Sequence, residues 1–349
     1  MSILLSPLSV NGLTLSNRMA LSPMCQYKAV DGLAGAWHQA HYGARAIGGV
    51  GLVMLESTAI TAEGRITHGC LGLWNDAQEQ ALRALVANGH DLGAAMGIQL
   101  NHAGRKGSAQ VPWHGGKALG INDGAWPVPA PSALAQDGGM SQPTAMSRDD
   151  IERTVAAYAA AAQRAVRAGF DVVELHLAHG YLLHQFLSPL SNQRDDEFGG
   201  DFDGRTRFPL QALQAVRAVL PAAMPLFVRL SCTDGVPGGW TVDESVKLAR
   251  LLRAAGVDLI DCTSGGIAPP QPRPAGVAFN ADAAQRVRSE GDIATGTVGG
   301  ITDAAQAEQI LATGQADLLL LGRALLSDPF WPLRGRRELV PSPYLRAQF

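Results

Sequence analysis

Short apolar runs recur along this chain, and a segment with helical periodicity follows each of them. The runs predict strands at 18–24, 51–56, 97–100, 172–177, 226–230, 259–262, 293–296 and 318–321. The predicted helices lie near 39–47, 77–89, 148–168, 204–219, 242–255, 280–288 and 303–313, with a short one after Arg323. Continuous apolar strands that alternate with amphipathic helices indicate a parallel sheet. Eight such units favour an α/β fold, a closed TIM or (β/α)8 barrel, over an open sheet.

Local signals agree with this pattern. Thr241 and Glu244 form a capping box of the Thr-x-x-Glu type, and Gly169 sits just past the predicted end of a long helix. No Gly-x-Gly-x-x-Gly motif follows the first strand, which counts against a Rossmann fold.

One segment interrupts the alternation of strands and helices. Residues 106–143 are rich in Gly and Pro, include Trp113, His114 and Trp126, and show no clear period. We expect an insertion after the third strand, on the carboxyl face of the barrel, acting either as a structural cap or as a substrate lid. No other boundary is evident, so the sequence predicts a single domain over 1–349.

Composition narrows the class of protein. The 349 residues are 46% hydrophobic and 17% charged with a net charge of -3, which is typical of a soluble globular enzyme. No basic block points to nucleic acid, no apolar stretch is long enough to span a bilayer, and the N-terminus lacks the features of a secretory signal. The four cysteines contain no Cys-x-x-Cys pair, which argues against a disulfide framework, a zinc knuckle or an iron–sulfur cluster. We therefore expect a cytoplasmic protein.

The strongest candidate chemistry follows the fourth predicted strand, where His176, His179 and Tyr181 lie within six residues. Barrel active sites form at the carboxyl ends of strands. Two imidazoles can hold a substrate oxygen by hydrogen bonds, and a phenol can deliver a proton. A metal site lacks a visible third ligand. Histidines that only pack in the core or lie on the surface are the other alternative, but the clustering at a strand end favours function.

Other strand ends carry residues suited to a ligand. Gly299 and Gly300, with Gly322 and Arg323, follow the last two strands, where barrels often bind phosphate. A plain turn and an ion pair at a helix end are the alternative.

Two more polar residues end buried strands. Arg229 needs a partner there, either a ligand anion or an acidic neighbour, and Gln99 pairs either with a heterocycle edge or within the core. Cys25, after the first strand, is most often a small buried hydrophobe.

Several long motifs in order resemble the old yellow enzyme family, and most closely its cysteine-containing, thermophilic-like branch. The motifs are Ser22-Pro-Met-Cys-Gln-Tyr27, Trp37-His-Gln-Ala-His-Tyr-Gly43, Gln99-Leu-Asn-His-Ala-Gly-Arg-Lys106, the histidine segment through Gly200, Val228-Arg-Leu-Ser231 and Leu321-Gly-Arg323. The resemblance covers nearly the whole chain. It implies a flavoprotein with tightly bound, non-covalent FMN and with NADPH or NADH as hydride donor.

The resemblance also implies a role for each site residue. Those implied to contact FMN are Pro23, Met24, Cys25, Ala59, Gln99, Arg229, Gly265, Gly299, Gly300, Gly322 and Arg323. Lys106 would neighbour the ribityl side. No metal is implied. Gly300 stands where a bulkier residue is expected, which predicts extra room beside the phosphate.

The implied reaction reduces the activated C=C bond of α,β-unsaturated carbonyls, maleimides or nitroalkenes. His176 and His179 would hold the substrate oxygen while flavin N5 gives hydride to Cβ and Tyr181 protonates Cα. Cys25 and Tyr27 would contact the substrate. In this branch an arginine of the C-terminal tail reaches the neighbouring subunit's active site, which implies a homodimer or homotetramer with Arg346 in that role.

Three other functions are alternatives to this reaction. Dienoyl-CoA and trimethylamine-type relatives share the barrel but carry an iron–sulfur cysteine cluster and further domains. An aldolase or isomerase would need a Schiff-base lysine or an acid pair at a strand end, and no lysine ends strands four to eight. A non-catalytic flavin-binding protein is disfavoured by the intact His176, His179 and Tyr181 set.

Overall fold

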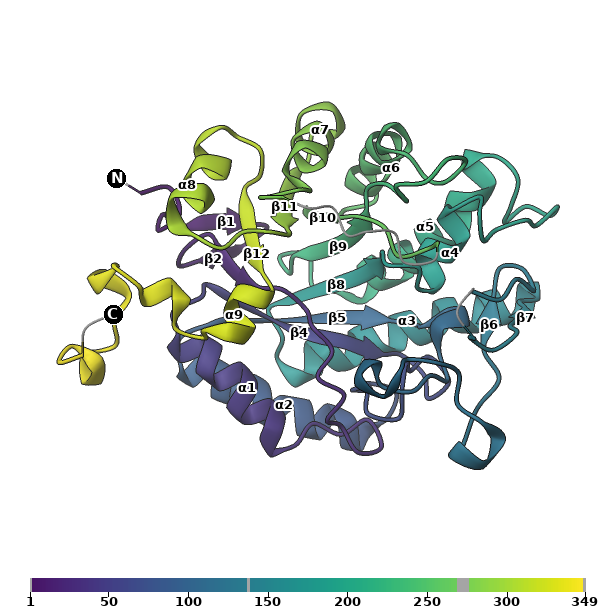
Figure 1. Ribbon diagram of the computed structural model, residues 1–349, viewed down its shortest axis with the longest axis horizontal. Coiled ribbons are helices and arrows are strands. Elements are labelled where there is room, and N and C mark those ends of the chain that lie inside the picture. Colours follow the sequence, from purple (N-terminus) through teal and green to yellow (C-terminus); the bar gives the residue numbers. More distant parts are fainter. Residues whose placement is uncertain (1, 137–138, 269–275, 348–349) are drawn as a thin grey trace.

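Eight parallel strands form a closed barrel in the computed structural model, which describes residues 2–136, 139–268 and 276–347. Around the barrel the strand order is β10-β11-β12-β3-β4-β5-β8-β9 (Figure 1). The barrel strands are β3 (Met19–Leu21), β4 (Leu52–Ala59), β5 (Ala95–Asn101), β8 (Val172–Leu177), β9 (Leu226–Ser231), β10 (Leu259–Thr263), β11 (Ala294–Val298) and β12 (Leu318–Leu321). All eight coincide with predicted strands, so the predicted TIM barrel is confirmed.

Helices surround the strands on the outside of the barrel (Figure 1). They are α1 (Ala36–Ile47), α2 (Asp76–Asp91), α3 (Arg148–Ala168), α4 (Leu182–Leu187), α5 (Phe202–Val219), α6 (Val242–Ala254), α7 (Ala281–Gly291), α8 (Ala304–Ala312) and α9 (Arg323–Ser327). Ser147 caps α3 and Thr241 caps α6, each by accepting from the third backbone N–H of its helix. The short helix α4 was not among the predicted elements, because its six residues are all buried and show no polar face.

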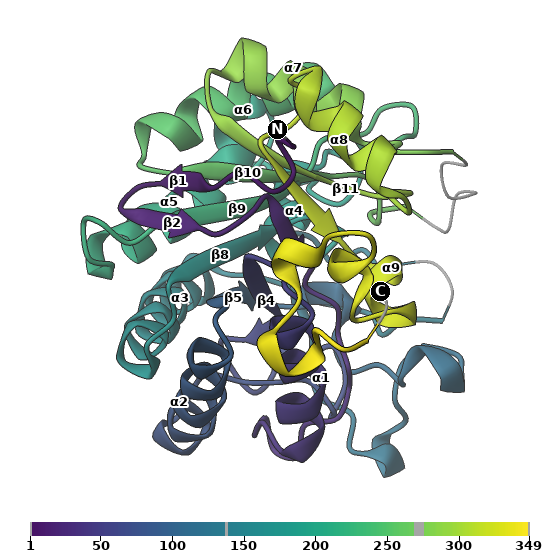
Figure 2. The same ribbon diagram turned by 90° about the vertical axis from the view of Figure 1, so that its left-hand side faces the viewer.

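A hairpin covers the amino end of the barrel. Strand β1 (Leu8–Val10) pairs antiparallel with β2 (Leu13–Leu15), on the side that faces the viewer in Figure 2. The buried side chains of Leu8 and Leu15 belong to the same apolar cluster as interior residues of the barrel. This end is therefore closed, and ligands have access from the carboxyl end.

The interior of the barrel is arranged in levels, because residues two apart on a strand point to the same side. The lowest level is an apolar plug that includes Leu52, Val172, Phe227 and Leu259. Two residues further along β8, β9 and β10 lies a polar layer of Glu174, Arg229 and Asp261, and Gln99 joins it from β5, in register with Glu174. The level above contains Asn101, His176, Ser231 and Thr263. The plug thus forms the floor beneath a buried polar layer.

The segment predicted as an insertion connects β5 to α3. It includes the short helices η2 (Pro112–His114) and η3 (Ile121–Asp123) and the strand β6 (Pro129–Ala130), which pairs with β7 (Thr144–Ala145). Trp113 is 60% exposed, and its ring lies edge-on to Tyr27 with 5.8 Å between centroids. Whether the segment is a cap or a lid stays a prediction.

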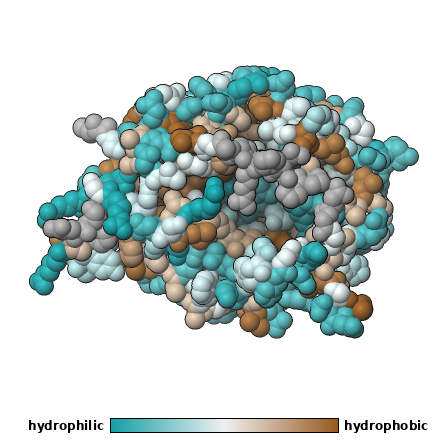
Figure 3. Space-filling view, viewed as in Figure 1, coloured by the Kyte–Doolittle hydropathy of each residue, from teal (hydrophilic) through white to brown (hydrophobic). Residues whose placement is uncertain are grey.

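The surface gives no indication of a membrane segment. On the face shown in Figure 3, hydrophobic residues are scattered among hydrophilic ones. No helix in the described part of the chain is long and apolar enough to cross a bilayer.

Candidate active site

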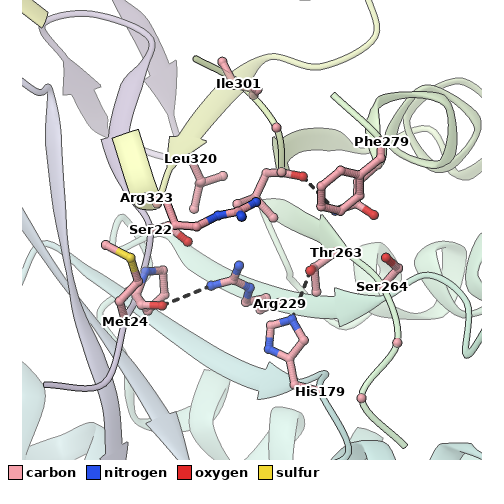
Figure 4. A pocket seen from close by; sticks show the side chains of 18 of the residues that line it. Ser22, Met24, His179, Arg229, Thr263, Ser264, Phe279, Ile301, Leu320 and Arg323 are labelled. Atoms are coloured by element: carbon pink, nitrogen blue, oxygen red, sulfur yellow. Dashed lines mark hydrogen bonds between the residues drawn. The ribbon is translucent and has the colours of Figure 1, made fainter. Parts of the chain in front are cut away.

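A cavity of about 1090 Å³ opens among the carboxyl ends of the strands (Figure 4). Its wall includes many of the residues predicted to bind a ligand, namely Pro23, Met24, His179, Arg229, Gly265, Gly299, Gly300, Gly322 and Arg323. These residues come from six different barrel strands or the loops that follow them. Closure of the barrel brings them together from nearly the whole length of the chain.

Three of the glycines predicted to bind a ligand have a left-handed backbone, which glycine adopts without strain. These residues are Gly265, Gly299 and Gly300, with φ of 71°, 113° and 69°. A Cβ on Gly299 would lie 2.4 Å from the ring of Phe279, and one on Gly300 would lie 2.4 Å from the carbonyl oxygen of Gly276. The expected extra room at Gly300 is therefore absent, because backbone occupies the space.

Arg323 begins the short helix α9 at the edge of this cavity. Its side chain is labelled in Figure 4, where the guanidinium extends among the side chains that line the cavity. Within the part of the chain that the structure describes, Arg323 makes no ion pair and lines the cavity, so the alternative of an ion pair at a helix end lacks support there. Bare glycine amides beside an unpaired guanidinium make a site that fits a phosphate.

Arg229 reaches the cavity from the polar layer. Its Nε lies 3.1 Å from Oδ2 of Asp261, so an acidic neighbour is present. The same guanidinium also lines the cavity, and its Nη1 donates a long hydrogen bond of 3.5 Å to the carbonyl of Pro23. One edge of Arg229 is therefore paired with an acidic neighbour, as one alternative predicted, and the other edge lines the cavity, where a ligand anion stays a prediction.

Gln99 is held from below. Its Nε2 donates to Oε1 of Glu174 at 2.8 Å, so its own carbonyl oxygen is not used in that contact. A carbonyl oxygen can accept from an N–H of a heterocycle. Ala59, at the end of β4, is buried and is not part of the cavity wall.

His176, His179 and Tyr181 converge where β8 ends. The ring centroids of His176 and His179 are 5.2 Å apart, and those of His176 and Tyr181 are 5.0 Å apart. His179 and Gly180 both adopt left-handed backbone, with φ of 58° and 71°. A tight turn of two such residues lets the three side chains face one space.

Burial makes this group neutral. It lowers the pKa of both His176 and His179, and the nearby charges of Arg229 and Lys106 lower them further. Burial also raises the pKa of Tyr181, which therefore keeps its proton. Nδ1 of His176 is buried without a partner, while Nε2 of His179 lies 3.0 Å from Oγ1 of Thr263. The cluster therefore offers neutral donors to a ligand oxygen.

Cys25, Tyr27 and Tyr181 form one wall of the site, packed against a small apolar cluster that contains Cys70. Burial raises the pKa of Cys25 and of Tyr27, so both keep their protons. Tyr27 has left-handed backbone, with φ of 53°. Cys25 is half-buried and packs against this cluster with one side.

Two residues support the turn that holds His179, and of these only Lys106 was given a place near the cofactor by the resemblance. Lys106 Nζ donates to the carbonyl oxygens of His179 and Gly266, at 2.7 and 2.6 Å, and burial lowers its pKa to about 8. His184 binds the backbone N–H of Gly180, although its apolar surroundings in the sequence suggest packing alone. The contacts of Lys106 could not be recognised from local pattern, because only the fold brings His179 and Gly266 near it.

One residue predicted to contact the substrate lies away from the cavity. Arg346 is exposed in the tail and does not line the cavity. Among the described residues, no group of three His, Cys, Asp or Glu side chains is placed to hold a metal ion.

Comparison with known proteins gives consistent matches. The protein-family model described as "NADH:flavin oxidoreductase / NADH oxidase family" matches residues 3–340. An NADPH dehydrogenase of Geobacillus thermodenitrificans is 44% identical over 340 residues, which are 97% of this chain and 95% of that protein. An NADPH dehydrogenase of Bacillus subtilis is 40% identical over 345 residues, 97% of each chain.

Solved structures agree with the sequence matches. Morphinone reductase superposes with a TM-score of 0.83 at 29% identity, covering 96% of this chain and 89% of that one. An old yellow enzyme homologue from Zymomonas mobilis has a TM-score of 0.79 at 25% identity, covering 96% of this chain and 92% of that one.

Proposed function

Because this chain belongs to the NADH:flavin oxidoreductase / NADH oxidase family, which includes the old yellow enzymes, we propose that it reduces the activated C=C bond of α,β-unsaturated carbonyls, maleimides or nitroalkenes. Its general activity, that of an FMN-dependent NADPH dehydrogenase, follows from its relatives. The proposal extends this to the electron acceptor and to the residues that act on it.

The observation that carries the proposal is the convergence of His176, His179 and Tyr181 beside the cavity as neutral hydrogen-bond donors. A carbonyl or nitro oxygen accepts hydrogen bonds and gains negative charge as the conjugated alkene is reduced. Neutral donors fixed in a dry site stabilise that charge without reorganising. This arrangement suits an enone-type acceptor better than a cationic amine.

The residues of the cavity fit FMN. Gly299, Gly300, Gly322 and Arg323 would take the phosphate, with Gly265 nearby, and Lys106 lies on the neighbouring loop. The flavin ring would lie against Pro23 and Met24, which line the cavity, with its pyrimidine edge toward Gln99 and Arg229. Cys25 and Ala59, which the resemblance also places near the ring, lie outside the cavity wall. Bound FMN supplies the redox chemistry, accepting hydride from NADPH or NADH and returning it to the substrate.

Each protein group then has a separate task. His176 and His179 bind the substrate oxygen and polarise the alkene, and each donor contributes about 3 kcal/mol by analogy with deletions in oxyanion holes. Tyr181 gives its proton to Cα. A positioned general acid raises the reaction rate by roughly 10²–10⁴-fold. Tyr27 and Cys25 position the ligand from the wall that they share with Tyr181. The neutral state of Tyr181 keeps its proton available until the substrate carbon needs it.

The proposal also includes the domain organisation and the oligomeric state. The described residues form one barrel domain with 106–143 as a segment beside the site, where Trp113 contacts Tyr27. In a homodimer or homotetramer, the exposed Arg346 is free to reach a neighbouring active site. Cross-linking of the enzyme, with kinetics of an Arg346→Ala variant, tests this part.

A comparison of Tyr181→Phe with the unchanged enzyme tests the reaction. Under anaerobic conditions, NADPH is added to bleach the visible flavin band, and 2-cyclohexenone is then added to restore it. We expect bleaching at the normal rate in Tyr181→Phe but recovery slowed by roughly 10²–10⁴-fold. Tyr158→Phe, which removes the hydroxyl of a buried tyrosine on α3, is the matched control and should recover normally.

The outcomes separate the parts of the proposal. Normal recovery in Tyr181→Phe removes the proton-donor role. Bleaching without recovery in the unchanged enzyme keeps the flavoprotein but excludes the enone. A protein without a yellow band, even after FMN is added, contradicts the proposal as a whole.

A further inference from the structure

The polar layer beneath the cavity contains one more acidic group than it has cations. Its four members come from four adjacent strands: Gln99 from β5, Glu174 from β8, Arg229 from β9 and Asp261 from β10. Each is at most 5% exposed. Below them lies the apolar plug, which cannot stabilise charge.

The contacts assign the single cation to Asp261. Nε of Arg229 lies 3.1 Å from Oδ2 of Asp261, on the neighbouring strand in register. Glu174 contacts the neutral amide of Gln99 instead, through Oε1 at 2.8 Å. The other oxygen of Glu174, Oε2, is buried with no partner. A buried carboxylate that lacks a cation and has one unpaired oxygen is costly, and the neutral acid avoids most of that cost.

The surroundings of Glu174 oppose a second negative charge. The titratable and charged groups recorded as facing it are Asp261 from β10 and Arg229 from β9, while its own strand adds the neutral His176. Burial raises the pKa of Glu174 to about 8 and the charge of Asp261 contributes, whereas Arg229 and the hydrogen bond from Gln99 lower it. Burial raises the pKa of Asp261 as well, but Asp261 lies within ion-pair distance of Arg229 whereas Glu174 contacts only a neutral amide, so the geometry assigns the proton to Glu174.

We propose that Glu174 is a neutral carboxylic acid at neutral pH, and that its ionisation at higher pH lowers the reduction potential of the bound flavin. It is a positioning residue, because it acts on the cofactor through Gln99 and Arg229. The inference rests on the proposed placement of the flavin beside these two residues. With Glu174 neutral, the positive charge of Arg229 is balanced by Asp261 alone. Ionised Glu174 adds a negative charge next to Arg229, which then stabilises negative charge on the reduced cofactor less well.

Reduction of the cofactor is coupled to proton uptake by Glu174. Reduction of the cofactor by hydride adds one negative charge near Arg229. Where Glu174 is ionised beforehand, it takes one proton from solvent as that charge forms, and it releases the proton when the cofactor is reoxidised. One proton per two electrons changes the equilibrium tenfold per pH unit, which is about 30 mV per pH unit for a two-electron couple.

The first test uses the holoenzyme and its Glu174→Gln variant, whose amide imitates the neutral acid. The midpoint potential of the flavin is measured from about pH 6 to about pH 10, a range that spans the titration of a raised carboxyl. We expect the two proteins to have parallel potentials below about pH 7, and only the unchanged enzyme to show the additional fall above about pH 8. Glu152→Gln, at an exposed position of α3, is the matched control and should behave as the unchanged enzyme.

A second measurement does not depend on a bound flavin, and its main signal is read in the unchanged protein. Infrared difference spectra between neutral and alkaline pH should show a protonated carboxyl that disappears at alkaline pH, and this signal should be missing in Glu174→Gln. In Asp261→Asn the signal should be lost at neutral pH, because Arg229 then pairs with Glu174 and holds it ionised. Parallel potentials across the whole pH range, or no protonated carboxyl at neutral pH, would overturn the proposal. A protein that never binds FMN contradicts the proposed function, while the infrared result still decides the state of Glu174.

Discussion

Nδ1 of His184 accepts a hydrogen bond from the backbone N–H of Gly180 at 2.9 Å. Because Nδ1 accepts, the proton lies on Nε2, which faces Oδ1 of Asp234 at 2.9 Å. Asp234 also accepts from the hydroxyl of Ser188 and the backbone N–H of Trp240. A fully buried pair therefore anchors the turn that holds His179, and the turn cannot shift without breaking it.

Replacing His184 by Leu should destabilise the protein and disturb the site together. The change removes the imidazole N–H that Asp234 accepts from, and a buried carboxylate that loses a hydrogen bond costs about 1–3 kcal/mol or more. Urea unfolding measures the loss, and recovery of the flavin band after adding enone measures the effect on the turn. His114→Leu, at an exposed position, should change the free energy of unfolding by less than about 0.5 kcal/mol. Equal stability of the two variants would show that the His184 pair contributes little.

Acid should destabilise this protein through its buried histidines. Burial lowers the pKa of His176, of His179 and of His102, the last to about 4, whereas an unfolded histidine titrates near ~6.5. Below that pH the unfolded chain binds protons that the native protein does not, so the free energy of unfolding decreases as the pH is lowered. Each such group contributes about 1.4 kcal/mol per pH unit while only its unfolded form is protonated.

Urea unfolding of His102→Gln at about pH 7 and about pH 5 isolates one of these terms. The variant should lose roughly 2 kcal/mol less than the unchanged enzyme between the two values. His114→Gln, which removes an exposed histidine, should lose as much as the unchanged enzyme. The same loss in all three proteins would mean that His102 is protonated in the native state.

Gly300→Ala should weaken FMN binding. The new Cβ would lie 2.4 Å from the carbonyl oxygen of Gly276, in a backbone conformation with φ of 69°. Left-handed strain alone costs about 1–3 kcal/mol for a non-glycine residue, and the contact adds to it. We expect the dissociation constant of FMN, measured by flavin fluorescence, to rise by at least roughly tenfold.

Gly93→Ala is the matched control for that variant. Gly93 has similar backbone, with φ of 88°, and nothing lies within 4 Å of its added Cβ. It should lose stability but bind FMN normally. Equal FMN affinity in both variants would place the phosphate away from Gly300.

Cys25 should react slowly with alkylating reagents. Burial raises the pKa of its thiol, and the neighbouring Cys70 and Glu56 raise it further. Since only the thiolate attacks iodoacetamide, modification at about pH 8 should be at least roughly tenfold slower than for an unperturbed thiol. Mass spectrometry of the native and the urea-unfolded protein measures both rates. Rapid modification of the native protein at Cys25 would show that the thiol is ionised.

Sequence patterns determined the barrel and the segment that contains His176, His179 and Tyr181. All eight strands could be predicted because strands of a parallel barrel are buried on both sides and leave continuous apolar runs, as in Leu318–Leu321. The convergence of His176, His179 and Tyr181 could be predicted because the three residues lie within one turn after a strand, so their short spacing in sequence keeps them close in space.

Tertiary structure alone decided which distant residues support that site. The pairing of Arg229 with Asp261, and the isolation of Glu174, depend on the register between neighbouring strands, which the sequence does not display. The space at Gly300 is filled by backbone from the preceding loop, which a comparison of side-chain sizes could not reveal. Closure of the barrel sets these contacts, because the stagger of its strands determines which side chains meet at each level of the interior.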